Sequence, residues 1–89
     1  MKLVFSDHAW DDYLLWQSPG SEKGLKRVNE LIKATRRAPF KGIGKPEALR
    51  GDLTGWWSRR ITEEHRFVYR VSGQGDAQSL EIAQLRYHY

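Results

Sequence analysis

The sequence contains no cysteine, which excludes disulfide bonds and thiolate metal ligands as supports of the fold. A chain without cysteine is typical of a reducing compartment, so we expect a cytoplasmic protein. Long apolar runs are also missing, since nothing approaches the ~18 consecutive apolar residues of a membrane span. The apolar run from Leu3 to Phe5 is too short for a signal peptide. We therefore expect a soluble protein that has no membrane partner.

The chain has 89 residues, of which 39% are hydrophobic, and this is too little material for two separate cores. Four Trp, four Tyr and three Phe must supply much of the buried surface. No internal repeat, low-complexity tract or long linker divides the sequence. We expect one domain that spans residues 1–89.

Positive charge is concentrated in the middle of the chain. The formal net charge is +4, but residues 36–70 carry nine Lys or Arg against four acids, a balance of +5. The remaining residues carry six bases and seven acids. Such a basic segment is typical of a protein that binds a polyanion such as nucleic acid, although many ordinary surfaces have a similar balance.

Two amphipathic helices are predicted in the first 40 residues, after a short strand at residues 2–5. Ser6 is a suitable N-cap with Asp7 in the first turn, and the first helix ends at the sequence SPG. Trp10, Tyr13, Leu14 and Gln17 follow at helical spacing and are expected to give this helix an aromatic face. The second helix ends before Pro39. Its buried side is expected to consist of Leu25, Val28, Leu31, Ile32 and Thr35.

Three strand-like segments follow a region rich in glycine. Residues 40–55 are expected to be irregular, with at most one short strand near residues 47–49. The segments WWSRRI, HRFVYRV and SLEIAQLRYHY are joined by short turns and predict an antiparallel meander. With both helices on one face of this sheet, the chain is predicted to be an α+β domain. The other face is left open to solvent or to a ligand.

Alternation along HRFVYRV indicates which side chains share a face of the sheet. Phe67, Tyr69 and Val71 point to one side, and Arg66 points to the other. If the aromatic side chains pack under the helices, Arg66 lies on the open face.

No pattern in the sequence is typical of a metal or cofactor site. His8 with Asp11 and Asp12 is the nearest candidate, and a polar patch on the first turns of a helix explains this group without a metal. The sequence KGIGK lacks the spacing of a phosphate-binding loop, and no motif supports a serine-based triad. We therefore predict no metal and no cofactor.

The remaining acids, bases and histidine suit the cleavage of RNA by its own 2′-hydroxyl group. This reaction needs a base that removes the 2′ proton, cations that stabilise the phosphorane, and an acid that protonates the leaving 5′ oxygen. Glu47 lies between Lys45 and Arg50 in the basic loop. It is either that base or a surface carboxylate that neutralises its neighbours.

Two further residues each have two interpretations. Arg66 is either a cation that clamps a phosphate or one half of a salt bridge to Glu63 or Glu64. His88, in the terminal sequence RYHY, is either the acid or an exposed terminal histidine without a role. Histidine exchanges a proton near neutral pH, as the acid in this reaction must.

Several longer motifs resemble one known family. TRRAPF, GKPE, WSRRITEEHR and the final RYHY are similar to sequences of the YoeB toxin family, a branch of the RelE superfamily of bacterial toxin–antitoxin systems. The resemblance covers nearly the whole chain and is weaker at residues 19–26 and in SGQGDAQS. It implies a RelE-like fold with the order β-α-α-β-β-β. It also implies a ribosome-dependent endonuclease that cuts mRNA in the A site and is neutralised by a YefM-like antitoxin.

The resemblance implies roles for individual residues as well. Glu47 would be the general base, Arg66 the cation at the transition state, His88 the general acid, and Tyr89 a positioning or stacking group. The residues that would contact RNA phosphates are Lys45, Arg50, Arg59 and Arg60.

Two other functions stay open. ParE-like toxins have the same scaffold but inhibit DNA gyrase, and a plain RNA-binding module would also account for the charge and the aromatic residues. Glu47, Arg66 and His88 together favour the enzyme, because a protein that only binds needs neither an acid nor a base. Trp56 and Trp57 either pack under the second helix or form an exposed patch that an antitoxin or a second copy of the chain covers.

The terminal position of His88 leads to a first prediction. The α-carboxylate of Tyr89 is a neighbouring anion that favours a protonated imidazole, so a C-terminal tag both removes this neighbour and obstructs access. We expect a short C-terminal tag to reduce ribosome-dependent mRNA cleavage far more than the same tag at the N-terminus. Equal activity of the two tagged proteins would contradict this expectation.

Overall fold

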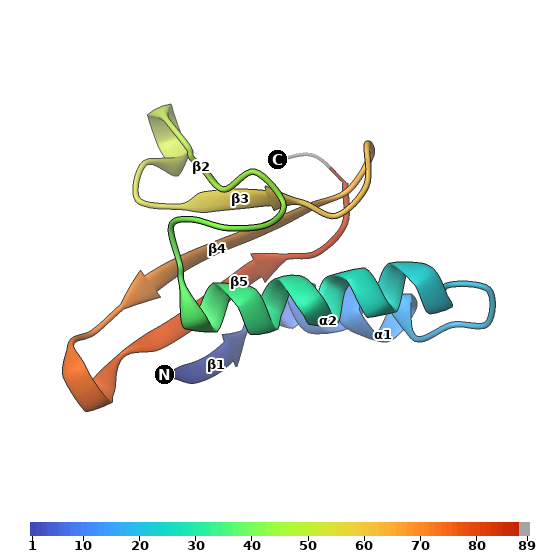
Figure 1. Ribbon diagram of the computed structural model, residues 1–89, viewed down its shortest axis with the longest axis horizontal. Coiled ribbons are helices and arrows are strands. Elements are labelled where there is room, and N and C mark those ends of the chain that lie inside the picture. The colour runs from blue at the N-terminus through green and yellow to red at the C-terminus, as the bar shows by residue number, and fades with distance from the viewer. Residues whose placement is uncertain (88–89) are drawn as a thin grey trace.

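Two helices and a five-stranded sheet make up the structure, a computed structural model that describes residues 1–87 (Figure 1). The elements in chain order are β1 (Lys2–Phe5), α1 (Asp7–Trp16), α2 (Glu22–Arg37), β2 (Glu47–Ala48), β3 (Trp57–Arg60), β4 (Arg66–Ser72) and β5 (Ser79–Gln84). Single turns of 3-10 helix lie at Gly51–Leu53 and Gly75–Ala77. The predicted α+β class is confirmed, and β2 is the extra short strand near residues 47–49.

The strand order in the sheet is β1-β5-β4-β3-β2. Strands β3 to β5 form the predicted antiparallel meander, with Trp57 opposite Tyr69 and Arg70 opposite Glu81. β2 adds to this meander by pairing antiparallel with β3. β1 pairs with β5 in parallel, so the complete sheet is mixed. The meander prediction did not include this pairing, because the two strands come from opposite ends of the chain and no local pattern links them.

Ser6 begins α1 as predicted. Its Oγ accepts a hydrogen bond from the Ala9 amide at 3.0 Å, which satisfies one of the free amides of the first turn. The same hydroxyl group donates to the Ala83 carbonyl at 2.9 Å. The cap therefore also ties the start of α1 to the end of β5.

The buried face of α1 differs from the predicted one. Ala9 and Asp12 are buried, whereas Trp10 and Leu14 are 47% and 46% exposed. The prediction for Trp10 and Leu14 is wrong because apolar side chains occur on both sides of this helix. The position of β5, which α1 packs against, decides which side is covered.

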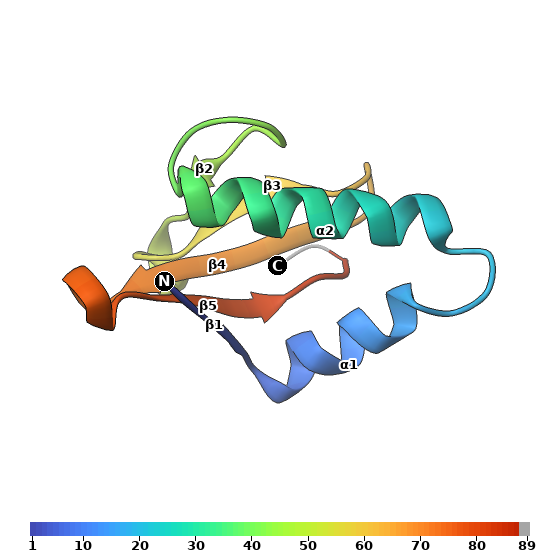
Figure 2. The same cartoon turned by 60° about the horizontal axis from the view of Figure 1, so that its bottom comes forward.

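α2 buries the predicted face. Figure 2 shows this helix lying over the sheet, with α1 beside the β1 and β5 edge. The buried residues of α2 are Val28, Leu31, Ile32 and Thr35. The Thr35 hydroxyl donates to the Leu31 carbonyl at 2.6 Å, so this polar group is satisfied in apolar surroundings. Within residues 1–87 neither α1 nor α2 is long and apolar enough to cross a membrane.

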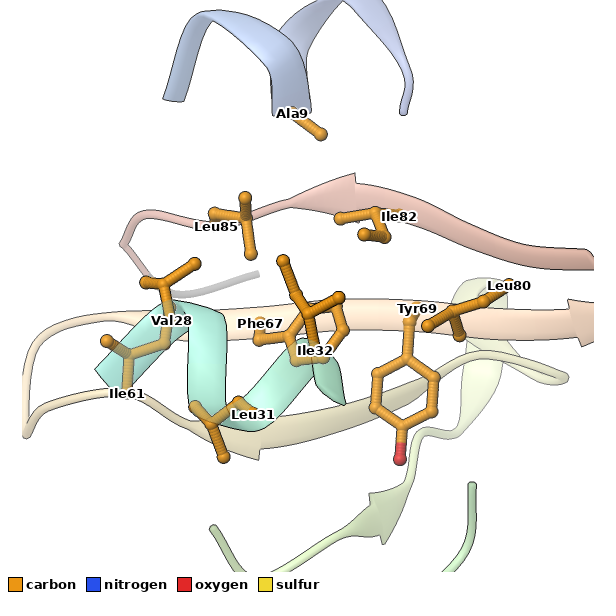
Figure 3. Close-up of a cluster of buried hydrophobic side chains, with 10 residues drawn as sticks. All are labelled: Ala9, Val28, Leu31, Ile32, Ile61, Phe67, Tyr69, Leu80, Ile82 and Leu85. Carbon is orange, nitrogen blue, oxygen red and sulfur yellow. The ribbon is translucent and has the colours of Figure 1, made fainter. Parts of the chain in front are cut away.

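One cluster of apolar side chains joins both helices to the sheet (Figure 3). Its members are Ala9, Val28, Leu31, Ile32, Ile61, Phe67, Tyr69, Leu80, Ile82 and Leu85. Phe67 and Tyr69 belong to the cluster and Val71 packs against it, so the predicted alternation along β4 is confirmed. We call this side of the sheet the core face and the opposite side the second face.

Arg59 is a buried part of the core face. Its side chain is 0% exposed, and its guanidinium donates to the carbonyl groups of Ala38 at 2.6 Å, Lys41 at 3.0 Å and Ile43 at 3.0 Å. Its Nε donates to the Tyr69 hydroxyl at 3.1 Å. The prediction that Arg59 contacts RNA is therefore wrong, because its donors are directed into the protein and bind the loop that follows α2.

Tyr69 completes this network. Its hydroxyl donates to the Pro39 carbonyl at 2.5 Å, so four carbonyl groups between residues 38 and 43 bind to two side chains of the sheet. Burial raises the pKa of the Tyr69 phenol, which keeps its proton available for this bond. The network fixes a loop that has no regular hydrogen bonds of its own.

Gly44 brings the end of this loop against the core. Its φ of +83° lies in the region that favours glycine, and a Cβ at this position would lie 2.7 Å from Leu31 Cδ2. The Gly44 carbonyl accepts a hydrogen bond from the Arg60 amide at 2.7 Å. The chain therefore arrives at β2 in a defined position beside β3.

The Arg59 network leads to a prediction about stability. An Arg59→Gln protein loses the buried guanidinium and three part-buried hydrogen bonds to the loop carbonyls, so we expect the free energy of unfolding to fall by roughly 2–4 kcal/mol. Arg60→Gln is the matched control, since the next arginine is exposed, and we expect a change within about 0.5 kcal/mol. Urea denaturation measures both. Equal midpoints for the two variants would contradict the structural role of Arg59.

Candidate active site

Three predicted site residues lie on the second face of the sheet. Residues directly opposite each other in antiparallel strands point to the same face. Glu47 is opposite Ser58 between β2 and β3, and Ser58 is in turn opposite Val68 of β4. Arg60 is opposite Arg66, two residues further along the same strands, so it shares this face with Glu47. The register thus brings Glu47, Arg60 and Arg66 together.

Glu47 stands on a defined strand and not on a free loop. The carboxylate is exposed, while its backbone is held by the β2–β3 ladder and by the anchored loop before it. Only β3 lies between β2 and β4, and the residue of β4 directly across from Glu47 is Val68, two residues from Arg66. With strands about 4.8 Å apart and a rise of about 3.3 Å per residue, the backbones at Glu47 and Arg66 are separated by roughly 12 Å.

Arg66 is oriented by the turn between β3 and β4. Its Nη1 donates to three backbone carbonyl groups, those of Thr62 at 2.7 Å, Glu63 at 3.0 Å and His65 at 3.2 Å. These bonds go to the backbone of the turn and not to the carboxylates of Glu63 or Glu64, which were the alternative partners. The guanidinium is therefore held at one end by a single nitrogen while remaining on the second face.

Arg60 and Arg66 form a like-charged pair across the β3–β4 ladder. Directly opposed like charges weaken a strand pair, so structure alone does not favour this arrangement. A bound anion such as a phosphate would offset the repulsion. The pair is therefore the strongest electrostatic indication that the second face binds an anion.

The other predicted RNA contacts flank β2. Lys45, with a φ of +52°, precedes Glu47, and Arg50 follows Ala48; both side chains are exposed. Positive charges therefore lie on either side of the carboxylate along the edge strand. Of the four basic residues predicted to contact RNA, Arg59 alone is turned away from this surface.

The segment after β5 also reaches this site. The Arg66 amide donates to the Tyr87 carbonyl at 3.1 Å, which places residue 87 beside the start of β4. His88 and Tyr89 lie outside the described residues, so their predicted roles stay predictions. The residue before them in the chain is nevertheless adjacent to Arg66.

Three residues that hold this segment were not recognised in the sequence. Asp12 accepts the Leu85 amide at 2.9 Å, and Trp16 Nε1 donates to the Leu85 carbonyl at 2.8 Å. His65 Nδ1 accepts the Tyr87 amide at 2.8 Å. The one sequence signal for Asp12 is that a carboxylate lies on the buried side of α1. No local pattern predicts that Trp16 and His65 bind the backbone of the segment after β5.

The two central tryptophans have different surroundings. Trp57 packs against the core, with its ring 4.8 Å from that of Phe40. The guanidinium carbon of Arg70 lies over the Trp56 ring, 4.6 Å from the ring centre. Arg70 Nε also forms a salt bridge with Glu81 Oε1 at 2.6 Å. This bond and one from Ser72 hold the pKa of Glu81 below its ordinary value. Both indoles are half-buried, and neither is among the large exposed apolar side chains of the described residues. Coverage of either tryptophan by an antitoxin or a second copy stays a prediction.

His8, Asp11 and Asp12, the nearest candidate for a metal site in the sequence, lie on the first turns of α1. His8 Nε2 lies 3.5 Å from Asp12 Oδ2, the same oxygen that accepts the Leu85 amide. Among residues 1–87 no group of three or more His, Cys, Asp or Glu side chains is arranged to hold a metal ion. Asp12 thus has a structural partner in Leu85, in the segment that follows β5.

Known proteins are similar to this chain over its whole length. The toxin YoeB of Escherichia coli K12 is 57% identical over 89 residues, which cover all of both chains. A solved YoeB/ParE toxin from Agrobacterium tumefaciens is 55% identical with a TM-score of 0.94, again over both full chains. YoeB of Staphylococcus aureus in a heterotetrameric YoeB–YefM complex is 43% identical with a TM-score of 0.84, covering 100% of this chain and 98% of the other.

A YoeB of Staphylococcus aureus has also been solved as a dimer, at 42% identity and a TM-score of 0.85, covering 100% of this chain and 98% of the other. Residues 5–89 match the profile of the YoeB-like toxins of bacterial type II toxin–antitoxin systems. The match includes β2, the start of β4 and the terminal segment, the three parts of the chain from which the site is built. The chain therefore belongs to the family of YoeB-like toxins of bacterial type II toxin–antitoxin systems.

Proposed function

We propose that this protein is a ribosome-dependent mRNA endonuclease that cleaves message in the A site and so inhibits translation. The observation that carries the proposal is that Glu47 and Arg66 share the second face while the segment after β5 is bound to the backbone of Arg66. Glu47 comes from β2, Arg66 comes from the start of β4, and Tyr87 is bound to the Arg66 amide immediately before the terminal histidine in the sequence.

The proposed chemistry uses the 2′-hydroxyl group of the RNA as the nucleophile. Glu47 takes the proton from this hydroxyl, and the 2′ oxygen forms a bond to the adjacent phosphorus. The bond from phosphorus to the 5′ oxygen then breaks, and His88 gives its proton to the leaving oxygen. The products are a 2′,3′-cyclic phosphate and a free 5′-hydroxyl, and no metal ion takes part in these steps.

Arg66 and Tyr89 complete the proposed set. The guanidinium of Arg66 stabilises the extra negative charge on the phosphorane, and the turn carbonyls orient it before substrate binds. Tyr89 positions or stacks on a base near the scissile bond, as single-stranded RNA is commonly read by aromatic rings. In this scheme Arg66 and Tyr89 transfer no proton, and proton transfer is carried out by Glu47 and His88.

Binding to the ribosome depends on the exposed basic residues. Lys45, Arg50 and Arg60 contact phosphates in the proposed complex, an interaction that does not select sequence and weakens with salt. A phosphate bound between Arg60 and Arg66 is stabilised most strongly, because it also offsets the repulsion between these two like charges. A ribosomal target also implies action in the cytoplasm.

We further propose that a YefM-like antitoxin neutralises this protein and that the chain forms homodimers. The complex and the dimer of the Staphylococcus aureus toxin support these partners. Exposed apolar side chains on β1 and α1 are available for such contacts, including Leu3, Trp10, Leu14 and Leu15. β1 and β2 are the opposite edges of the sheet, so an antitoxin bound to this apolar surface would not have to cover Glu47.

The acid–base proposal predicts a large loss of cleavage when either proton-transfer group is removed. Glu47→Ala and His88→Ala are each expected to lower the single-turnover rate constant on programmed ribosomes by about 10²- to 10⁴-fold. Glu30→Ala, which removes an exposed carboxylate from α2, is expected to leave the rate unchanged. Primer extension on the translated message measures the cuts. If wild type leaves the message intact and translation proceeds, the enzyme proposal is wrong.

The phosphate-contact proposal predicts a change in the salt dependence of ribosome binding. Arg60→Gln is expected to weaken binding and to reduce the slope of log K against log salt by about one. Lys23→Gln, which removes an exposed charge from the start of α2, is the control and should leave the slope unchanged. Equilibrium binding between about 50 and 200 mM salt measures both. Identical slopes for the two variants would exclude Arg60 from the interface.

A further inference from the structure

The segment after β5 is bound at almost every backbone group although it is no longer part of a strand. β5 ends at Gln84. Asp12 and Trp16 of α1 bind the Leu85 amide and carbonyl, and the Gln84 side chain donates to the Arg86 carbonyl at 3.0 Å. Side chains replace the missing ladder, and they direct the chain across the end of the sheet to Arg66.

Tyr87 is the last described residue of this segment and the most constrained. Its φ of +62° lies in the left-handed region, which costs free energy for a residue with a side chain. Its carbonyl is bound by the Arg66 amide at 3.1 Å and its amide by His65 Nδ1 at 2.8 Å. The two bonds on either side of this strained residue hold it in place.

His65 is itself held independently of Tyr87. Its amide donates to Thr62 Oγ1 at 3.1 Å, and its carbonyl accepts the Ile61 amide at 3.0 Å. The imidazole ring lies between two aromatic rings, with centroids 5.2 Å from Trp16 and 5.0 Å from Tyr87. The turn therefore presents Nδ1 at a fixed position, and changing the side chain does not remove the bonds that form the turn.

The direction of the bond determines the protonation state of His65. Tyr87 supplies the N–H, so Nδ1 is the acceptor and carries no proton. Protonation of the ring would place two donors against each other at this point. Addition of a proton at Nδ1 would therefore break the bond to Tyr87.

We propose that neutral His65 is a positioning residue that holds the C-terminal segment beside Arg66 through the Tyr87 amide, and that protonation of His65 releases this segment. The inference rests on the proposed function, in which His88 follows Tyr87 as the acid. His88 must be protonated to act and His65 must be neutral, so the two histidines set opposite limits on the pH range of cleavage. His65 does not touch the reacting atoms in this scheme.

The groups that face His65 come from three elements. α1 contributes the uncharged ring of Trp16, and the C-terminal segment contributes the ring of Tyr87. From its own turn, Arg66 donates to the His65 carbonyl at 3.2 Å, and Glu63 and Glu64 are exposed. A charged imidazole would thus stand between two aromatic rings beside a guanidinium, with the nearest carboxylates in solvent.

The test compares wild type with His65→Asn and His65→Leu. The Asn side-chain oxygen can accept the Tyr87 amide from a position close to that of Nδ1 and does not titrate, whereas Leu cannot accept at all. Single-turnover cleavage on ribosomes is measured from about pH 5.5 to 8.5, and exchange of the Tyr87 amide with solvent is measured by NMR on the free protein. Thermal unfolding confirms that each variant is folded.

We expect His65→Leu to lower the rate constant about tenfold or more at pH 7.5, with little change in KM and with faster Tyr87 exchange. His65→Asn should stay within about threefold of wild type at this pH and lose less activity than wild type as the pH falls. His8→Asn, which removes the other described imidazole from an exposed position on α1, should preserve the wild-type pH profile.

The contrary outcomes separate the possible failures. Wild-type cleavage and Tyr87 exchange in His65→Leu would overturn the positioning role, and equal losses in the Asn and Leu variants would reduce His65 to a packing residue. An unchanged acidic limb in His65→Asn would overturn the release of the segment by protonation. If wild type does not cleave but Tyr87 exchange responds to the Asn and Leu changes as expected, the proposed function fails while the His65–Tyr87 contact stands.

Discussion

The buried guanidinium of Arg59 is the interaction on which the site depends. The 38–43 segment has no regular secondary structure, and its carbonyl groups would lack partners without Arg59 and Tyr69. By binding them, β3 draws the loop against the core face and delivers the chain to β2. A two-residue strand such as β2 cannot fix its own position, so the register that places Glu47 opposite Ser58 depends on this buried network.

The second face is assembled from segments that are weak by themselves. β2 is a short edge strand, Arg66 is the first residue of β4, and the segment after β5 is irregular. β2 is held by its ladder with β3, Arg66 by the turn that precedes it, and the segment after β5 by side chains of α1 and of the β3–β4 turn. Such a design leaves the chemistry on exposed groups while the backbone beneath them is constrained, and constrained backbone is what allows proton-transfer groups to meet a substrate in one geometry.

Residue type and motif predicted part of this site well. The α+β class, the buried side of α2, the alternation along β4 and the short strand at Glu47 all follow from local patterns, because propensity and periodicity act over a few residues. Charge was a poorer guide: Arg59 and Arg60 are neighbours in the sequence, yet one is buried in the core and the other is exposed. Strand alternation predicts that Arg59 and Arg60 point to opposite faces of the sheet, but it does not predict which face the helices cover.

The sequence by itself determined the absence of disulfide support, the family to which the chain belongs and most of the secondary elements. The last predicted strand was too long, because β5 ends at Gln84. Only the tertiary structure decided that Arg59 is a structural residue, that α1 turns Ala9 and Asp12 to the sheet, and that His65 binds the Tyr87 amide. The physical reason is that hydrogen bonds to backbone groups depend on position in space and not on residue type. Segments distant in the sequence become partners only after the sheet has set their register.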